Sequence, residues 1–277
     1  MNAQDNEANT SSKATTAIGF PAPLLGEQNL RLRVLYNEGG LLALEKSPHI
    51  LNGPHPWYMN RPVLSDAINE QLAAEKPELL RLGLKASEPV QPIFHMDPGI
   101  AGVAIFAHNA EIANTARNNF GSNLWTLRFR LVAFGGPVDD EASCDLPVAR
   151  HNQMPMALIS HRSGKKTCTS FKRIEKLGRY NLWEATTNYY RADQLPLHAS
   201  ELGIRILGET HYCRESPMFL SRLKKHWEGD RETEQPIYEA PSAWLSEVTL
   251  DNGVTIKAEA PARLNTLIKQ IRKFCTR

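Results

Sequence analysis

The segment from Trp125 to Gly135 constrains the fold more than any other part of the chain. It reads WTLRFRLVAFG, and from Trp125 to Leu131 its side chains alternate, with apolar residues at the odd positions and Thr or Arg at the even ones. Because successive side chains of a strand point to opposite faces, this pattern predicts a strand with one face in a core and one face exposed. Such half-buried strands are typical of antiparallel sheets.

The other strands are predicted mostly in pairs around turns. LRLRVLY and LLALEKSP flank a turn at 37–40, KTCTSFKRIEK and YNLWEATTN flank a turn around Gly178, and WLSEVTL and VTIKAEA flank Asp251-Asn252-Gly253. Asn and Gly accept positive φ, so the last of these turns is a strong hairpin signal. A single strand is predicted at 103–107, directly after a glycine-containing turn.

Helices are expected at irregular intervals between these strands. One covers 65–75, with Ser65 as a possible N-cap and Pro77 as its limit. AEIANTARNNFG predicts a second helix that ends near Gly121, and PLHASELG predicts a short third one. A final helix places five apolar residues on one face: Leu264, Leu267, Ile268, Ile271 and Phe274. Successive strands with interspersed helices indicate an α+β fold around a largely antiparallel sheet.

Composition favours one folded domain after a short tail. Residues 1–20 are expected to be a disordered polar tail, because no bulky apolar side chain follows Met1 up to about Thr16. Residues 21–277 are expected to form the domain, since the 277-residue chain is 42% hydrophobic and can fill a packed core. With 32 Lys and Arg against 30 Asp and Glu, the charge balance allows an acidic partner without indicating one.

Cysteine and histidine spacing argues against a metal or disulfide framework. The four cysteines form no C-x-x-C pair, and the nine histidines form no H-x-x-x-H pair. We therefore expect no metal and a reduced compartment. No apolar run reaches the length of a membrane span, and the first residues lack the apolar stretch of a signal peptide. The expected protein is soluble and cytoplasmic, without membrane contact.

Asp97 is the first candidate for chemistry. It lies in a Met-Asp-Pro-Gly turn directly before the strand predicted at 103–107. A carboxylate in such a position can act as a nucleophile or an acid–base group. Asp before Pro-Gly is also ordinary turn chemistry, so the pattern alone favours a turn residue over a catalytic one.

Three segments in order carry a resemblance to one known family. FHMDPGIAGVAIFAHNAEIANTARNNF is similar to a family run of His-Arg-Leu-Asp, two variable residues, Thr-Ser and Gly, with Asp97 and Gly102 at the matching places. Upstream, VLYNEGGLLALEKSPHILNGPHP looks like the family's opening hairpin. Downstream, a family motif Gly-Arg-Thr-His-Gln-Ile-Arg matches at Arg191 and Gln194. From about Leu30 to the C-terminus, the chain thus resembles the RluA-type RNA pseudouridine synthases.

The resemblance implies a pseudouridine-synthase-like sheet with a central RNA-binding cleft, and an enzyme that isomerises uridine to pseudouridine in ribosomal or transfer RNA. Such an enzyme needs no cofactor, flips the target base out of its stack, and is expected to be a monomer. Asp97 would be the nucleophile, Arg191 would pair with it, and Phe129 would stack against the base. Five further residues are expected to bind the RNA substrate: His95, Gly102, Gln194, Arg128 and Arg130.

The chain departs from the family pattern at several of these places. Phe129 stands for a tyrosine and lacks its hydroxyl, whereas His95 stands for an arginine that fills the gap left by the flipped nucleotide. Further departures together thin the positive charge expected around an RNA site: Ile100-Ala101 for Thr-Ser, Asp193 for His, and Pro196 for the second Arg. Glu209 also replaces the family's Asp, without a change of charge.

These departures keep a second function open, a non-catalytic RNA-binding relative that retains the fold. His95, Phe129 and Pro196 favour that alternative, whereas the presence of both Asp97 and Arg191 favours an enzyme. Structural explanations also exist for single residues, because Arg191 can form a surface ion pair and Phe129 can be a core side chain.

Overall fold

The structure, a computed structural model, describes residues 17–55 and 57–276. Its centre is a 12-stranded sheet with the main order β1-β2-β3-β5-β13-β6-β11-β10-β7, to which β4, β12 and β14 add at the sides. A separate two-stranded sheet is formed by β8 and β9. The strands have these bounds: β1 Ala17–Phe20, β2 Leu30–Glu38, β3 Leu41–Lys46, β4 Gln91–Pro92, β5 Ala101–Ala107, β6 Thr126–Gly135, β7 Glu141–Cys144, β8 Val148–Arg150, β9 Ala157–Ile159, β10 Thr169–Leu177, β11 Tyr180–Thr187, β12 Ile204–Ile206, β13 Ala243–Thr249 and β14 Thr255–Lys257.

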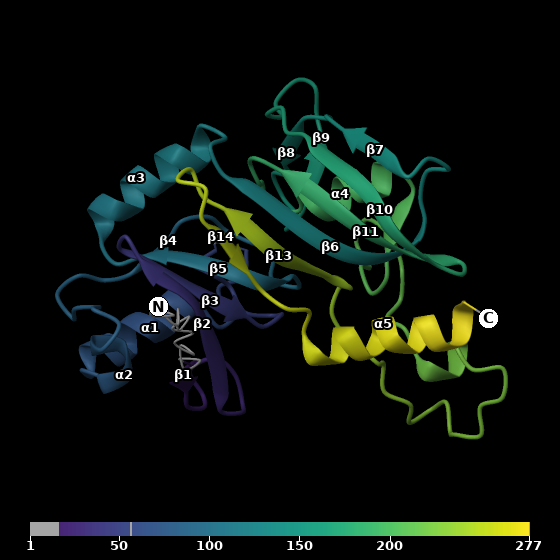
Figure 1. Cartoon of the computed structure of the whole chain (residues 1–277), viewed down its shortest axis with the longest axis horizontal. Coiled ribbons are helices and arrows are strands. Elements are labelled where there is room, and N and C mark those ends of the chain that lie inside the picture. Colours follow the sequence, from purple (N-terminus) through teal and green to yellow (C-terminus); the bar gives the residue numbers. More distant parts are fainter. Residues whose placement is uncertain (1–16, 56, 277) are drawn as a thin grey trace, which may run out of the picture.

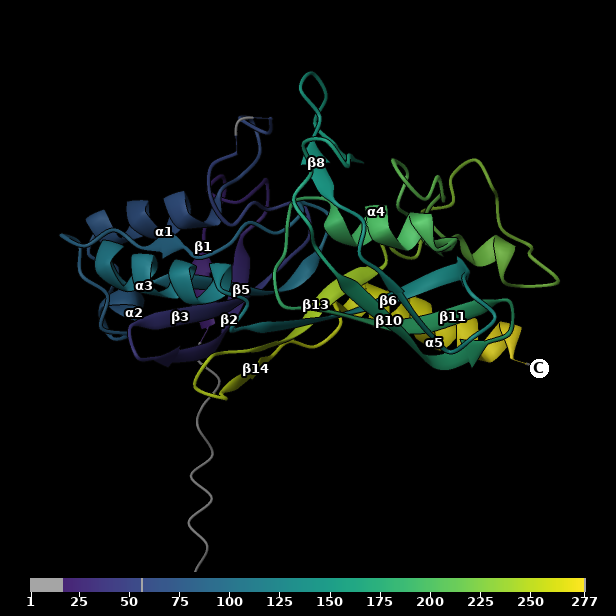
Figure 2. The ribbon, with the colours of Figure 1, turned by 90° about the horizontal axis from the view of Figure 1, so that it is seen from above.

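Helices cover both faces of the sheet (Figures 1 and 2). Figure 2 shows α4 and α5 on opposite faces, with β8 rising on the side of α4. None of the helices in the described ranges is long and apolar enough to cross a membrane. The helices have these bounds: α1 Leu64–Ala73, α2 Pro77–Leu80, α3 Ala110–Gly121, α4 Gln194–Glu201, the 3-10 turn η1 Leu220–Arg222, and α5 Ala262–Cys275.

The alternation in β6 decides which residues face which core. Leu127, Phe129 and Leu131 are fully buried in the cluster that includes Leu195 and Ala199 of α4. Val132, at an even position, instead belongs to the cluster formed with the apolar face of α5. A third cluster packs α1 against β2 and β3. Each face of the sheet therefore has its own core, and the Asp97 loop lies on the face of α4.

The fold class predicted from the sequence is confirmed. The three predicted hairpins are present as β2–β3, β10–β11 and β13–β14, and the predicted helices correspond to α1, α3, α4 and α5. All pairings between named strands in the described ranges are antiparallel except β13 with β5. That exception joins segments far apart in the sequence, and no local turn signal could have predicted it.

Two local predictions are wrong. Residues 17–20 belong to β1 rather than to a disordered tail, because Ile18 and Phe20 are 0% and 1% exposed in the core against α1. The rest of the predicted tail lies outside the described residues. Ser65 does not cap α1, since the N-cap position is Val63 and Ser65 is buried inside the first turn. Short elements such as β4, β8 and β12 were not predicted, because two or three residues carry no periodic pattern.

Gly102 allows the parallel contact between β5 and β13. Its φ is +117°, a conformation that L side chains rarely adopt, and a Cβ at this position would lie 2.2 Å from the backbone oxygen of Leu245. The candidate role of Gly102 in binding RNA is therefore replaced by a packing role, since its absent side chain lets two strand backbones approach.

We expect Gly102→Ala to lower the free energy of unfolding by about 2–4 kcal/mol, because the new methyl group meets backbone that cannot move aside. Gly121→Ala is the matched control, since Gly121 ends α3 with no atom within 4 Å of a built Cβ. Urea unfolding of the two variants checks the prediction, and equal stability of both would contradict it.

Candidate active site

Asp97 lies in the loop between β4 and β5, on the face of the sheet that carries α4. The backbone N–H of Ile100 donates to the Asp97 carbonyl at 3.0 Å and closes the turn predicted from Asp-Pro-Gly. The side chain is not a solvated turn residue, because Asp97 is only 8% exposed. A carboxylate in that environment requires hydrogen-bond donors.

Both carboxylate oxygens of Asp97 have a donor from one distant segment, the turn between β11 and α4. The hydroxyl of Tyr190 donates to Oδ2 at 2.5 Å, and the backbone N–H of Asp193 donates to Oδ1 at 2.8 Å. Asp193 has a left-handed φ of +59°, which is uncommon for a residue with a side chain. The turn at 190–193 thus holds the carboxylate from two sides.

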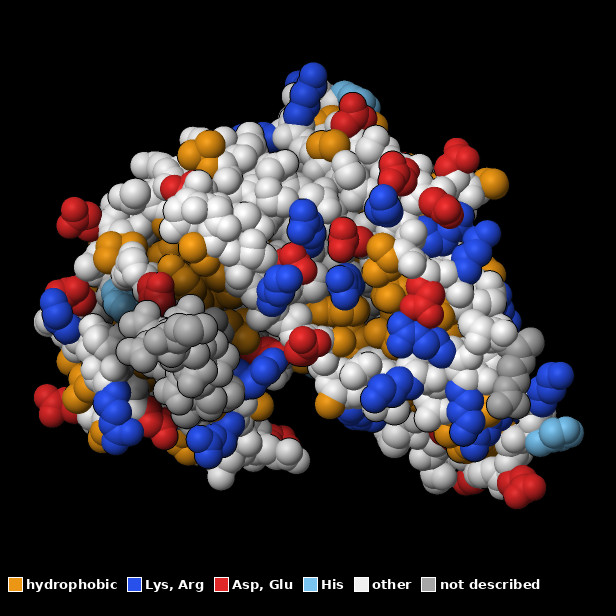
Figure 3. All heavy atoms as spheres, in the orientation of Figure 1, with side chains coloured by type: hydrophobic (Ala, Val, Ile, Leu, Met, Phe, Trp, Pro, Cys, Tyr) orange, Lys and Arg blue, Asp and Glu red, His pale blue; other side chains and the backbone are white. Residues whose placement is uncertain are grey.

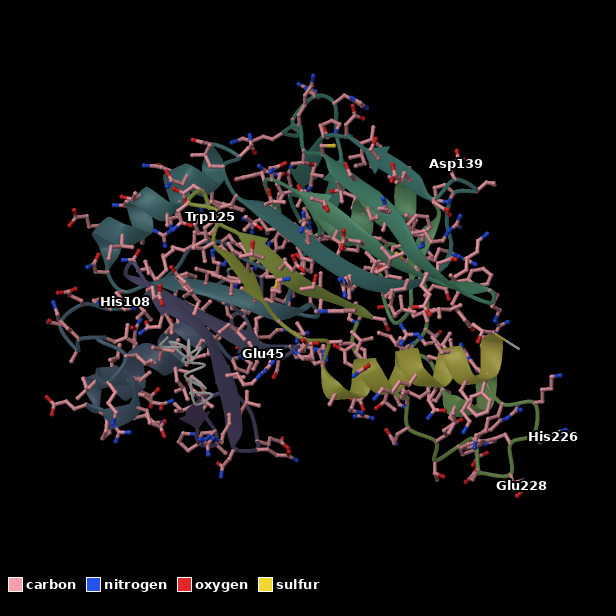
Figure 4. All side chains as sticks on the ribbon, viewed as in Figure 1. Glu45, His108, Trp125, Asp139, His226 and Glu228 are labelled. Atoms are coloured by element: carbon pink, nitrogen blue, oxygen red, sulfur yellow. The ribbon has the colours of Figure 1, made fainter. Side chains whose placement is uncertain are left out.

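Lys46 is a buried cation on the other side of the Asp97 loop. It is 1% exposed, and its Nζ donates to the carbonyls of Ile50 at 2.9 Å and Pro98 at 3.4 Å. Its neighbour Glu45, labelled in Figure 4, lies between the β2–β3 hairpin and α5 in that view and pairs with Arg33 at 2.6 Å. Strand alternation therefore sends Lys46 alone toward the Asp97 loop.

These surroundings shift the pKa values of Asp97 and Lys46. Burial, followed by the neighbouring charge of Asp193, raises the pKa of Asp97 to about 7, against the opposing effects of its two hydrogen bonds and of Lys46. Burial lowers the pKa of Lys46 to about 7, and Asp97 opposes that shift. Burial also raises the pKa of Tyr190 well above its usual range, so its hydroxyl keeps its proton. Asp97 is thus poised near neutral pH, as acid–base and nucleophilic groups often are.

A small cavity and a larger hollow lie in front of Asp97. The small cavity, about 20 Å³, is lined by Asp97 and holds about one water molecule. The hollow beside it measures about 440 Å³ and is lined mainly by apolar and aromatic side chains. Five residues line both the cavity and the hollow, and we call them the partition: His55, Trp57, His95, Ala192 and Asp193.

The partition is held by contacts to the β8–β9 hairpin. The guanidinium of Arg150 lies 3.9 Å from the ring centroid of Trp57, and the hydroxyl of Tyr58 donates to the carbonyl of Pro155 at 3.5 Å. Because these are exposed or half-buried side chains with few partners, the part of the partition around Trp57 is weakly held compared with Asp193, which is hydrogen-bonded to Asp97 and Tyr212.

The comparisons with known proteins concern the sequence and the fold of the chain. No family model matches the chain. Over 206 residues, it is 24% identical to an uncharacterized RNA pseudouridine synthase of Chlorobaculum parvum, which covers 72% of this chain and 61% of that protein. Over 203 residues, it is 25% identical to the ribosomal large subunit pseudouridine synthase D of Zymomonas mobilis. This match covers 72% of this chain and 62% of that protein. The chain thus spans about three fifths of the length of these relatives.

Two solved human structures share the fold. RNA pseudouridylate synthase domain containing 4 superposes with a TM-score of 0.64 at 14% identity, covering 86% of this chain and 92% of that one. RNA pseudouridylate synthase domain containing 1 superposes with a TM-score of 0.55 at 15% identity, covering 87% of this chain and 94% of that one. The chain is a divergent relative of the RNA pseudouridine synthases. The resemblance seen in its motifs is confirmed at this level.

The structure does not pair Arg191 with Asp97, as the pseudouridine synthase resemblance had implied. Within residues 17–55 and 57–276 no ion pair joins them, and the donors to the carboxylate are Tyr190 and Asp193. The half-buried Arg191 side chain lines the 440 Å³ hollow instead. His95 also lines this hollow, and burial followed by the charge of Arg117 lowers its pKa.

Phe129 lies beneath Tyr190 rather than in the hollow. Its side chain is 0% exposed, and its ring centroid is 5.0 Å from that of Tyr190. A base cannot stack directly on Phe129 while Tyr190 covers it. Tyr190, which follows the strand rather than lying within it, presents an aromatic surface and a hydroxyl at this place. It stands directly before Arg191, where the pseudouridine synthase motif has Gly.

Gln194 supports the turn at 190–193 through buried hydrogen bonds. It is 0% exposed; its amide donates to the hydroxyls of Thr169 and Thr187, and its carbonyl oxygen accepts from the Arg191 N–H at 3.0 Å. The predicted contact between Gln194 and substrate is therefore corrected to a positioning role, because its hydrogen bonds are directed to the protein.

Arg128 and Arg130 lie on the wrong face for this site. Their side chains project from β6 opposite to Phe129 and pair with Glu247 at 3.2 Å and Glu184 at 3.9 Å. Figure 3 shows this face, where cationic and acidic side chains are interspersed over the middle of the sheet. The alternation of β6 thus places these arginines away from Asp97, and their predicted contact with RNA stays a prediction.

Sequence reasoning missed Tyr190 and Lys46 as parts of the site, whereas Trp57 is in a loop that the sequence offered either as an RNA contact or as a cover for the core's edge. A signal for Tyr190 was the pair of aromatic residues directly before Arg191, but nothing local shows that one of them reaches Asp97.

Within the described residues, no group of three or more His, Cys, Asp or Glu side chains could hold a metal ion.

The raised pKa of Asp97 predicts a distinct dependence of stability on pH. Between its ordinary pKa of 3.8 and the folded value of about 7, the folded protein holds a proton that the unfolded chain has lost. The free energy of unfolding should therefore fall as pH rises through this window. Relative to Asp97→Asn, which cannot ionise, we expect the wild type to lose roughly 2–3 kcal/mol between about pH 4 and pH 6. Parallel curves from urea titrations would contradict the prediction.

Proposed function

We propose that this chain is an RNA pseudouridine synthase that isomerises uridine in ribosomal or transfer RNA, with Asp97 as the nucleophile. The observation that carries the proposal is the buried Asp97 carboxylate, held by Tyr190 and Asp193 beside an aromatic hollow of about 440 Å³. The relatives in sequence are named as RNA pseudouridine synthases, which supports the same reaction.

The reaction fits a site built only from side chains and backbone. Isomerisation breaks the bond from ribose carbon 1′ to uracil nitrogen 1, forms a bond from that carbon to uracil carbon 5, and moves one proton from carbon 5 to nitrogen 1. Atoms and electrons balance without a cofactor. A carboxylate that forms a transient covalent adduct divides this difficult step into easier ones.

The surroundings of Asp97 give its neighbours separate roles. Lys46 and the two hydrogen bonds favour the ionised carboxylate that a nucleophile requires, against the cost of burial. Tyr190 keeps its proton and fixes the orientation of Oδ2. In this proposal Tyr190 and the backbone of Asp193 position the carboxylate, while the aromatic residues of the hollow hold the base.

Access requires the part of the partition around Trp57 to move. The 20 Å³ cavity in front of Asp97 cannot hold a uracil ring, whereas the 440 Å³ hollow beside it can. A flipped nucleotide would enter the hollow and displace Trp57 and its neighbours from the position they occupy here. The few contacts of this loop make such a movement inexpensive compared with opening the sheet.

One observation favours the second function, a non-catalytic RNA-binding relative. Asp97 has both oxygens occupied by protein donors and is enclosed, and Arg191 forms no ion pair with it in the described structure. In that case the carboxylate would serve as an anchor for the turn at 190–193. The two functions make opposite predictions for the effect of replacing Asp97 on modified RNA.

We expect Asp97→Asn to remove one or a few pseudouridines from ribosomal or transfer RNA, because the amide cannot act as the nucleophile. Turnover in vitro should fall by on the order of 10⁴-fold or more. Pseudouridine mapping in cells that carry either version measures this. Asp139→Asn, at the exposed position labelled in Figure 4, is the control and should leave the map unchanged. An unchanged map for Asp97→Asn with intact RNA binding would favour the second function.

We expect Tyr190→Phe to move the acidic limb of the kcat/KM profile upward by about one pH unit. Losing a hydrogen bond to the charged form raises the pKa of Asp97, so less nucleophile is ionised at a given pH. Tyr238→Phe is the matched control, since Tyr238 is a buried tyrosine whose hydroxyl has no partner among the described residues. A profile for Tyr190→Phe that coincides with wild type would show that its hydroxyl does not position Asp97.

A further inference from the structure

A second hollow adjoins the aromatic one and differs from it in character. It measures about 720 Å³ and lies over the ends of β10 and β11 and the chain that follows α3. Its lining is mostly polar and includes Lys165, Lys166, Arg191, Asn123 and Asn188. Such a surface offers N–H donors and positive charge rather than an apolar pocket.

The described residues give the cations of this hollow no acidic partner. Within the described parts of the chain, no carboxylate lies within ion-pair distance of Lys165, Lys166 or Arg191. Asp145 is the one carboxylate in the lining. The net charge of the whole chain is only +2, so this excess is local. Unpaired cations around a hollow favour an anionic occupant.

The two hollows meet at Gly121, Tyr189 and Arg191, which line both. On one side of this junction lie the aromatic side chains beside Asp97, and on the other lie the lysines. A single-stranded nucleic acid has the same two-part chemistry, because its bases stack on aromatic rings while its phosphates follow positive charge.

We propose that the Lys165–Lys166–Arg191 hollow binds the phosphodiester backbone of single-stranded RNA next to the nucleotide whose base enters the aromatic hollow. This inference rests on the proposed function. It gives Arg191 a contact to phosphate at the junction, which agrees with the absence of a pair with Asp97 in the described structure. Asn123, Asn188 and Thr186 supply donors and acceptors for phosphate and 2′-hydroxyl groups.

Cys168 provides a built-in reporter for this hollow. It lines the hollow and is exposed, whereas Cys144 and Cys213 are buried. Cys275 is half-buried at the end of α5, does not line the hollow, and serves as an internal reference. We expect single-stranded oligouridylate to slow alkylation of Cys168 by maleimide several-fold while leaving Cys275 unchanged, as measured by mass spectrometry.

The affinity for single-stranded oligouridylate, measured at different salt concentrations, tests whether Lys165 and Lys166 neutralise phosphates. For single strands, log K falls with log salt by about 0.7 for each phosphate neutralised, so Lys165→Ala/Lys166→Ala should reduce the slope by about 1.4. Lys172→Ala/Lys257→Ala is the matched control, since both lysines are exposed and paired with glutamates at 2.9 and 3.5 Å. The control should keep the wild-type slope.

The outcomes separate this inference from the proposed function. Unprotected Cys168 and an unchanged salt slope in the lysine variant overturn the inference, even if the wild type forms pseudouridine. Protection of Cys168 and a reduced slope support it, even if no pseudouridine forms and the proposed reaction is lost. Equal protection by double-stranded RNA would show that the hollow does not select single strands, and would overturn that part of the inference.

Discussion

A buried carboxylate needs hydrogen-bond donors, and in this protein that requirement ties three distant segments together. Asp97 receives one donor from the Tyr190 side chain and one from the Asp193 backbone, while Lys46 approaches its loop from β3. Removing either of the two donors leaves the buried carboxylate with too few partners, which is costly, and Lys46 holds the same loop through the Pro98 carbonyl. The turn at 190–193, the Asp97 loop and the end of β3 are therefore fixed relative to one another, and the hollow beside them has a defined shape.

Most of the sheet could be predicted from the sequence, because hairpins and alternation are local signals. Asp251-Asn252-Gly253 predicts its own turn, and the alternation of β6 also determines that Phe129 and Arg128 point to opposite faces. The parallel contact of β5 with β13 could not be predicted, since it depends on Gly102 meeting Leu245 more than a hundred residues later. Ile18 and Phe20 were missed because a four-residue strand is too short for a period to show.

The site was predicted less completely than the fold. Asp97 could be selected because the resemblance added information that a single turn lacks. The resemblance also placed an aromatic ring at Phe129, but the ring beside the hollow is that of Tyr190, which covers Phe129 with centroids 5.0 Å apart. Which of two neighbouring aromatic residues reaches a carboxylate depends on the path of the chain after β11, and that path has no periodic signature. Residues that act through tertiary position were consequently the ones that sequence reasoning missed.

The separation of charges across the two hollows has a physical reason. An RNA phosphate close to Asp97 would raise the pKa of that carboxyl further and disfavour the ionised nucleophile, because like charges repel more strongly where solvent is excluded. The lysines that we propose to bind phosphate lie in the polar hollow, and Arg191 stands at the junction between that hollow and the aromatic one. A guanidinium at this place can bind a phosphate and also screen Asp97 from its charge. The neutral uracil ring can then occupy the aromatic hollow without adding charge beside the nucleophile.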